Sequence, residues 1–151
     1  MTRAEQAEVY FLQGYNCAQA TVLAFSDLFS FDKEILLRMI SSFGGGMGRL
    51  REVCGAMSAI FFVTGLLYGY SDPKDDAGKA ELYARIQDLA ARFESLYGTI
   101  VCRELLGLTT HHDSPVPTKR TADFYETRPC RKIIGTAARI LDEYIREHPV
   151  E

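Results

Sequence analysis

Residues 53–71, with the sequence VCGAMSAIFFVTGLLYGYS, form a long stretch without a charged side chain and decide how the rest of the chain is interpreted. The length is close to that of a membrane-spanning helix. Small and polar residues dilute the stretch, however, and the chain has no second segment of this kind to partner it. The amphipathic segments on either side need an apolar helix to pack on. We therefore expect a buried core helix here and not a membrane span.

The segments around this stretch have the capping residues and apolar spacing of amphipathic helices. Thr2 and Glu5 are spaced as a capping box, and Asn16 and Asp32 are good N-caps for the next two helices. The expected helices cover residues 2–14, 16–29, 32–43, 53–71, 73–98, 102–106 and about 129–147.

The longest helix is expected to begin at Asp72 and Pro73, because aspartate caps helices and proline fits the first helical position. Residues 108–122 contain prolines, threonines and a serine and are expected to form an irregular loop. No stretch alternates apolar and polar residues as a strand would. The sequence thus predicts an all-α fold, a single-domain helical bundle of about six or seven helices over residues 1–151.

Composition excludes some classes of function. With 17 basic and 20 acidic residues, the chain lacks the positive surface that nucleic-acid binding requires, so we expect no nucleic-acid partner. The N-terminus shows neither a secretory signal nor a lipidation motif, which predicts a cytoplasmic protein. In a reducing cytoplasm, four cysteines are not expected to form two permanent disulfides.

The four cysteines are the candidate chemical groups, and three of them fall in the first turn of an expected helix. Cys17 follows the Asn16 cap, whereas Cys102 and Cys130 each lie three residues after a threonine. Cys54 has no equally clear cap before it. The positive end of a helix dipole favours a thiolate, so the sequence predicts lowered thiol pKa values.

Basic side chains near the cysteines point in the same direction, since a close cation lowers a thiol pKa further. They are Arg49 and Arg51 before Cys54, Arg103 after Cys102, and Arg128, Arg131 and Lys132 around Cys130. The alternative is that each cysteine is a small buried hydrophobe and each arginine a solvated surface group.

Two kinds of shared chemistry are open to four thiols on separate helices. Four thiolates can hold zinc or an iron–sulfur cluster, and helix bundles can bring one ligand from each of several helices together. The absence of any CxxC pair argues in part against such a site. The other possibility is dithiol–disulfide exchange, in which one thiolate attacks a disulfide and a second resolves it. The competing hypothesis involves no shared chemistry: the protein is a non-enzymatic small-molecule-binding or interaction module whose cysteines are buried and inert.

A glycine run, Gly44-Gly45-Gly46-Met47-Gly48, directly precedes Arg49. It matches no nucleotide-binding fingerprint, and a helix stop with a tight turn is its simplest interpretation. It could also support the cysteine site by close backbone approach. On this hypothesis the candidate cofactor-binding residues are Gly45, Gly46, Arg49 and Gly55.

Two weaker candidates are expected to have structural roles only. The irregular loop contains three consecutive polar residues, His111, His112 and Asp113. They are expected to form a solvated polar turn. Asp75 and Asp76 are placed where acidic residues favour a helix start.

Several motifs occur in the order that marks a known family. They are GYNCAQA at 14–20, FGGGMGR at 43–49, CGA at 54–56, Cys102 before ELLG at 104–107, and Cys130. This set resembles the C_GCAxxG_C_C family of small redox-active proteins with four cysteines and a CGAxxG motif. The final glycine of that motif is Ala59 here.

The resemblance implies redox or metal chemistry at Cys17, Cys54, Cys102 and Cys130, as catalytic residues and as metal ligands. Zinc and an iron–sulfur cluster are the expected cofactors, with dithiol exchange as the alternative. The sequence specifies neither the redox partner nor whether the protein is an enzyme, and it is compatible with a homo-oligomer.

Overall fold

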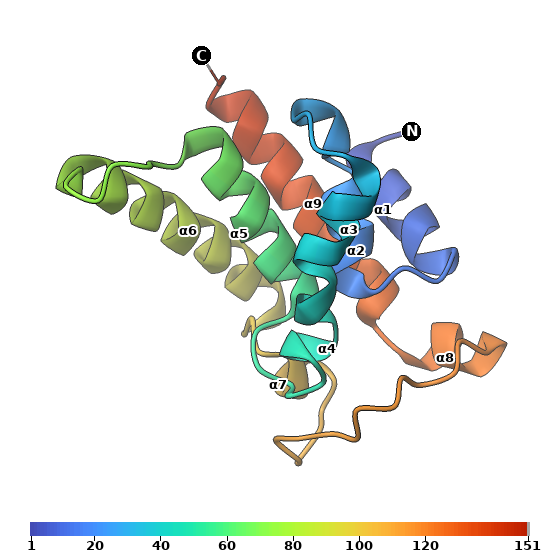
Figure 1. Ribbon diagram of the computed structural model, residues 1–151. Coiled ribbons are helices and arrows are strands. Elements are labelled where there is room, and N and C mark those ends of the chain that lie inside the picture. The colour runs from blue at the N-terminus through green and yellow to red at the C-terminus, as the bar shows by residue number, and fades with distance from the viewer. Residues whose placement is uncertain (151) are drawn as a thin grey trace.

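The computed structural model describes residues 1–150, which form helices joined mostly by short turns (Figure 1). The helices are α1 (Arg3–Leu12), α2 (Cys17–Leu23), α3 (Lys33–Ile40), α4 (Gly44–Met47), α5 (Gly55–Tyr68), α6 (Asp76–Tyr97), α7 (Cys102–Leu105), α8 (Ala122–Thr127) and α9 (Cys130–Glu147), with the 3₁₀-helices η1 (Ser26–Leu28) and η2 (Ser41–Phe43). Within residues 1–150 there is no strand, only an isolated antiparallel bridge between Val53 and Val101. The predicted all-α fold is confirmed.

The central position belongs to α5, as its uncharged sequence predicts. It packs against α2, α9 and α6, while α1 lies across α9 and α2. Ala56, Met57, Ala59, Ile60 and Val63 of α5 have no exposed surface. The predicted core helix is therefore confirmed. None of the helices within residues 1–150 has both the length and the apolarity needed to cross a membrane.

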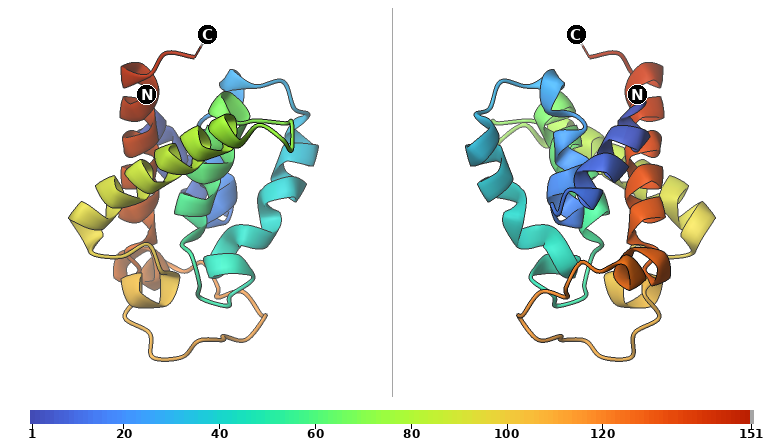
Figure 2. Two further views of the ribbon diagram at one scale, coloured as in Figure 1. Left: turned by 90° about the vertical axis from the view of Figure 1, so that its left-hand side faces the viewer. Right: turned by 90° about the vertical axis from the view of Figure 1, so that its right-hand side faces the viewer.

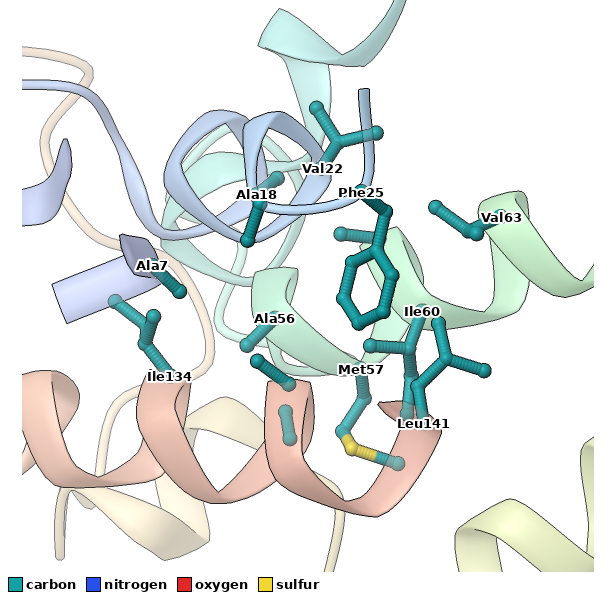
Figure 3. Close-up of a cluster of buried hydrophobic side chains, with 14 of the residues drawn as sticks. Ala7, Ala18, Val22, Phe25, Ala56, Met57, Ile60, Val63, Ile134 and Leu141 are labelled. Carbon is teal, nitrogen blue, oxygen red and sulfur yellow. The ribbon is translucent and has the colours of Figure 1, made fainter. Parts of the chain in front are cut away.

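A cluster of buried hydrophobic side chains lies where α2, α5 and α9 meet (Figure 3). Phe25, just after α2, projects toward α5, and Met57 of α5 reaches toward Leu141 of α9. All three side chains are fully buried. Burying a side chain of this size contributes roughly 1.5–3 kcal/mol relative to leaving it in water.

The predicted N-caps of the first three helices are confirmed. The side chains of Thr2, Asn16 and Asp32 each accept a hydrogen bond from the backbone N–H three residues later, at 3.1, 2.8 and 3.1 Å. At α2 the bond is reciprocated, because the Asn16 N–H donates to the side chain of Gln19 at 3.2 Å. This complete capping box fixes the orientation of the residue that follows it, Cys17.

The predicted start of the longest helix is wrong. The side chain of Asp72 accepts from the Lys74 N–H at 2.9 Å and so closes a turn. Asp75 caps α6 instead, accepting from the Gly78 N–H at 2.8 Å. Local side-chain bonds of this kind compete with helix initiation, which explains the delay to Asp76.

The predicted end of the second helix and the predicted number of helices also differ from the structure. The second helix ends at Leu23 and not at Phe29, because the chain tightens into η1 where Arg3 donates to the Ala24 carbonyl at 2.6 Å and to Asp27 at 2.7 Å. The number of helices is higher than the predicted six or seven, since α4 and α8 were not expected.

The irregular segments gather at one end of the molecule. Figure 2 shows α4, α7 and the long connection between α7 and α8 together at the end opposite both termini. Residues 106–121 form this connection, called here the cover loop. The functional candidates of the sequence lie at this end.

Candidate functional site

Each of the four cysteines stands at the beginning of a different helix. Cys17, Cys102 and Cys130 are the first residues of α2, α7 and α9, which confirms their predicted places. Cys54, left unassigned by the sequence, is the N-cap of α5. Val101 is the N-cap of α7, and Thr99 acts one step earlier by accepting from the Val101 N–H at 3.0 Å.

These four helix starts converge on one cavity of about 230 Å³. Its lining includes Cys17, Cys54, Cys102 and Cys130, although they come from four separate parts of the sequence. The remaining lining residues are glycines and arginines near the cysteines and a group of mainly apolar residues: Gly44, Gly45, Gly55, Arg49, Arg51, Arg120, Arg128, Asn16, Thr118, Phe11, Leu105, Leu106, Pro117, Phe124, Ile133 and Ile134.

The predicted lowering of the thiol pKa values is wrong for three cysteines. Burial raises the pKa of Cys17 and of Cys54 and raises that of Cys130 to about 11. Removal from water disfavours a thiolate, and at these positions this effect exceeds the stabilisation from the helix starts. In the reduced protein these three thiols are therefore neutral at physiological pH.

Backbone amides offset part of the burial effect. The amides of Gly45 and Ala18 lower the pKa of Cys17, and those of Ala56 and Met57 lower the pKa of Cys54. These groups are aligned to stabilise negative charge on sulfur once a proton has been removed.

The thiols also influence one another. Charge on Cys102 raises the pKa of Cys17, Cys54 and Cys130, and charge on Cys17 raises that of Cys54 and Cys130. Cys102 and Cys17 thus lie near the other thiols. Within residues 1–150, however, no three His, Cys, Asp or Glu side chains are grouped so that they could hold a single metal ion.

The glycine run forms a left-handed turn beside the cysteines. Gly45, Gly46, Met47, Gly48 and Arg49 all have φ between 60° and 70°, and the Gly48 N–H donates to the Gly44 carbonyl at 2.9 Å. Only glycine adopts this conformation readily, and each other residue costs roughly 1–2 kcal/mol. The prediction of a turn was right, but its left-handed path was not foreseen.

Two glycines of this site are required by close contact. A Cβ on Gly46 would lie 2.6 Å from the Cβ of Cys102, and a Cβ on Gly55 would collide with the Sγ of Cys17. Of the predicted cofactor-binding residues, Gly45, Arg49 and Gly55 line the cavity. Gly46 does not line the cavity but packs closely against Cys102.

Arg51 is a buried cation at the site, with 4% of its surface exposed. Its Nη1 donates to the Sγ of Cys102 at 3.7 Å, and its Nη2 donates to a carboxylate oxygen of Asp113 at 3.0 Å. Proximity in sequence suggested Cys54 as the partner of Arg51, but in the structure Arg51 contacts Cys102. Its φ of 61° is unusual for a residue other than glycine.

The cover loop closes one side of the cavity and was missed by sequence reasoning. Asp113, predicted to be a solvated turn residue, pairs with Arg51 and with Arg49, the latter at 3.3 Å. Arg49 also donates to the Ser114 carbonyl at 2.6 Å. No local pattern marks such contacts, because the partners are more than 60 positions apart.

Other basic neighbours named from the sequence point away from the thiols. Arg103 pairs with Glu52 at 3.1 Å, and Arg131 pairs with Glu8 at 3.4 Å. Arg128, in contrast, lines the cavity and lowers the pKa of Cys130 against the larger effect of burial.

The order and placement of the four cysteines agree with a known family. A family model described as "Putative redox-active protein (C_GCAxxG_C_C)" matches residues 15–144. The chain belongs to the C_GCAxxG_C_C family. Comparisons with curated proteins and with solved structures give no significant match.

The motif that names the C_GCAxxG_C_C family has a structural explanation in this chain. Cys54 caps α5, Gly55 allows Cys17 to approach, and Ala56 is fully buried against the core. Ala59, at the position of the final glycine, has no exposed surface. The motif therefore joins the cysteine cavity to the centre of the bundle.

Proposed function

We propose that this member of the C_GCAxxG_C_C family is a cytoplasmic redox protein that holds an iron–sulfur cluster on Cys17, Cys54, Cys102 and Cys130. The observation that carries the proposal is the lining of one cavity by all four sulfur-bearing side chains. Four thiolates are the usual ligand set of such clusters, which supply one-electron transfer when bound.

The grouping of the potential donors favours a cluster over a single zinc ion. A zinc site needs four donors about 2.3 Å from one point. Within residues 1–150 no three potential donors are grouped in that way, yet four cysteines line a shared cavity. A polynuclear group suits ligands that surround a space and do not meet at a point.

Burial of the thiols favours ligation over disulfide exchange. Exchange requires an accessible thiolate, whereas Cys54 and Cys102 are 7% and 8% exposed. Burial also raises the pKa of Cys17, Cys54 and Cys130. Such thiols react slowly by themselves, while metal binding removes their protons.

The charges around the cavity suit an anionic four-thiolate site. Arg49, Arg51 and Arg120 line the cavity, and among its lining residues there is no Asp or Glu. Buried negative charge needs such compensation. The amides at the start of α5 add to it for Cys54.

The deciding experiment is iron and sulfide analysis with an absorption spectrum of protein purified and reconstituted anaerobically. We expect iron, acid-labile sulfide and a visible charge-transfer band. Replacing Cys17, Cys54, Cys102 or Cys130 by serine should lower the iron content, the sulfide content and the intensity of the band. Circular dichroism checks that each variant is folded. Colourless protein that binds no iron, or iron binding unchanged in the serine variants, would overturn the proposal. If the protein binds no iron but its cysteine thiols are lost on oxidation, the result would favour dithiol–disulfide exchange.

Two glycines of the same helix provide a matched pair for this assay. Gly55→Ala places a methyl group against the sulfur of Cys17 and is expected to lower iron content. Gly65→Ala meets nothing within 4 Å and is expected to leave it unchanged. Equal iron content in the two variants would show that the contact with Cys17 does not matter for binding.

A further inference from the structure

The lining of the cavity includes apolar residues besides the cysteines. Phe11, Leu106, Pro117, Phe124 and Ile133 contribute apolar surface, from α1, the cover loop, α8 and α9. Ligand cavities commonly combine such a surface with a few polar groups that fix orientation. Thiolate ligation of a redox group does not require this apolar surface.

Arg128 differs from the other three arginines of the lining. Arg49 is held by Asp113 and Ser114, Arg51 by Asp113 and Cys102, and Arg120 by the backbone carbonyls of Phe11 and Tyr15 at 3.0 and 3.1 Å. In the part of the chain that the structure describes, 1–150, Arg128 has no hydrogen bond or ion pair from its guanidinium. Its guanidinium carbon lies 5.6 Å from the ring centre of Phe124, and its charge lowers the pKa of Cys130.

Arg51 adds a buried hydrogen-bond donor that has no partner. Nε of Arg51 is buried and has no hydrogen-bond partner, although Arg51 itself lines the cavity. A buried donor without a partner carries a free-energy cost unless a ligand satisfies it. The lining of the cavity thus combines apolar surface with positively charged groups.

We propose that this cavity binds a small organic anion with an aromatic or branched apolar body. Its carboxylate pairs with the guanidinium of Arg128, a geometry that permits two parallel hydrogen bonds. Its apolar body lies against Phe11, Leu106 and Phe124. The inference rests on the apolar residues of the lining and on Arg128. It does not depend on the identity of the redox group at the cysteines.

The test is isothermal titration of the anaerobically purified protein with benzoate and with neutral benzamide as its control. Arg131 provides a matched variant, because it is an arginine of the same helix end but pairs with Glu8 and is absent from the cavity lining. We expect benzoate to bind, benzamide to bind about tenfold more weakly or not at all, and R128Q to weaken benzoate at least about tenfold. R131Q should leave benzoate binding unchanged, and R128K, which keeps the charge but loses the two parallel hydrogen bonds, should bind benzoate more weakly than the unmodified protein and more tightly than R128Q.

Iron content of R128Q separates this inference from the proposed function. We expect R128Q to keep its iron and lose benzoate, whereas the serine variants lose iron. Absence of benzoate binding, equal binding of benzamide, or an unaffected R128Q would overturn the inference. Loss of iron in a folded R128Q would also overturn it, since Arg128 would then serve the redox group.

Discussion

The start and the middle of α5 lie in very different surroundings. Ile60 and Val63 are enclosed by regular right-handed helices with apolar side chains, whereas Cys54 at the start of the helix faces a cavity with cations and thiols. The non-glycine residues with positive φ within residues 1–150 are Met47, Arg49 and Arg51, all at the cavity end. The comparison shows that the regular core stabilises a neighbouring region that is strained and carries buried charge.

The largest expected effect on the free energy of unfolding comes from the core. Phe25→Ala removes a ring with no exposed surface and should lower the free energy of unfolding by about 3–5 kcal/mol. Leu96→Ala, at a side chain that is 58% exposed, should change it by less than about 0.5 kcal/mol. Urea denaturation measures both. Similar values for the two variants would contradict the assignment of the core to the α2, α5 and α9 contact.

A pair of glycines in the left-handed turn tests the cavity end. Gly46→Ala combines a φ of 68° with contacts to the backbone of Arg51 and Glu52 at 2.9 Å, and should cost about 2–4 kcal/mol. Gly48→Ala shares the positive φ but meets nothing within 4 Å, so only about 1–2 kcal/mol is expected. The difference between their urea midpoints isolates close packing from backbone strain. If the two midpoints agree, packing against Cys102 is not a constraint.

Alkaline pH should weaken the cavity end more than the core. The folded pKa of Cys130, raised to about 11 by burial, lies above its unfolded value of about 8.5. The stabilisation from this neutral thiol is complete below about pH 8.5 and is lost as the pH rises toward 11. Reduced, metal-free protein should therefore lose stability over this range, and Cys130→Ser should lose less. Parallel curves for the two proteins, measured by urea denaturation, would contradict the prediction.

The smallest effect is expected from the cover loop. The hydrogen bond from Arg51 lowers the pKa of Asp113, so its contribution is present above the unfolded value and is lost as pH falls through the folded one. Asp113→Asn should speed hydrogen exchange of the cover loop and leave exchange in α5 unchanged. Asp88→Asn, on an exposed helical pair with Arg92, is the control and should not alter loop exchange. Faster exchange throughout the molecule would show that the loop and core are not separable.

Much of the fold was predictable because its signals are local. The apolar run of α5 and the caps Thr2, Asn16 and Asp32 each act within a few residues, and all were confirmed. The errors at α6 and α2 arose where another bond displaced the local signal, at Asp72 and at Arg3. The left-handed turn was hidden because a glycine run permits several conformations.

For the site, the sequence by itself determined which residues are the candidate chemical groups and that Cys17, Cys102 and Cys130 begin helices. Only the tertiary structure decided that all four cysteines line one cavity, that burial raises the pKa of Cys17, Cys54 and Cys130, and that Arg51 binds Cys102. Caps and periodicity are set by neighbours along the chain. Desolvation and distant charge depend on what folds over a side chain, and no local sequence pattern contains that information.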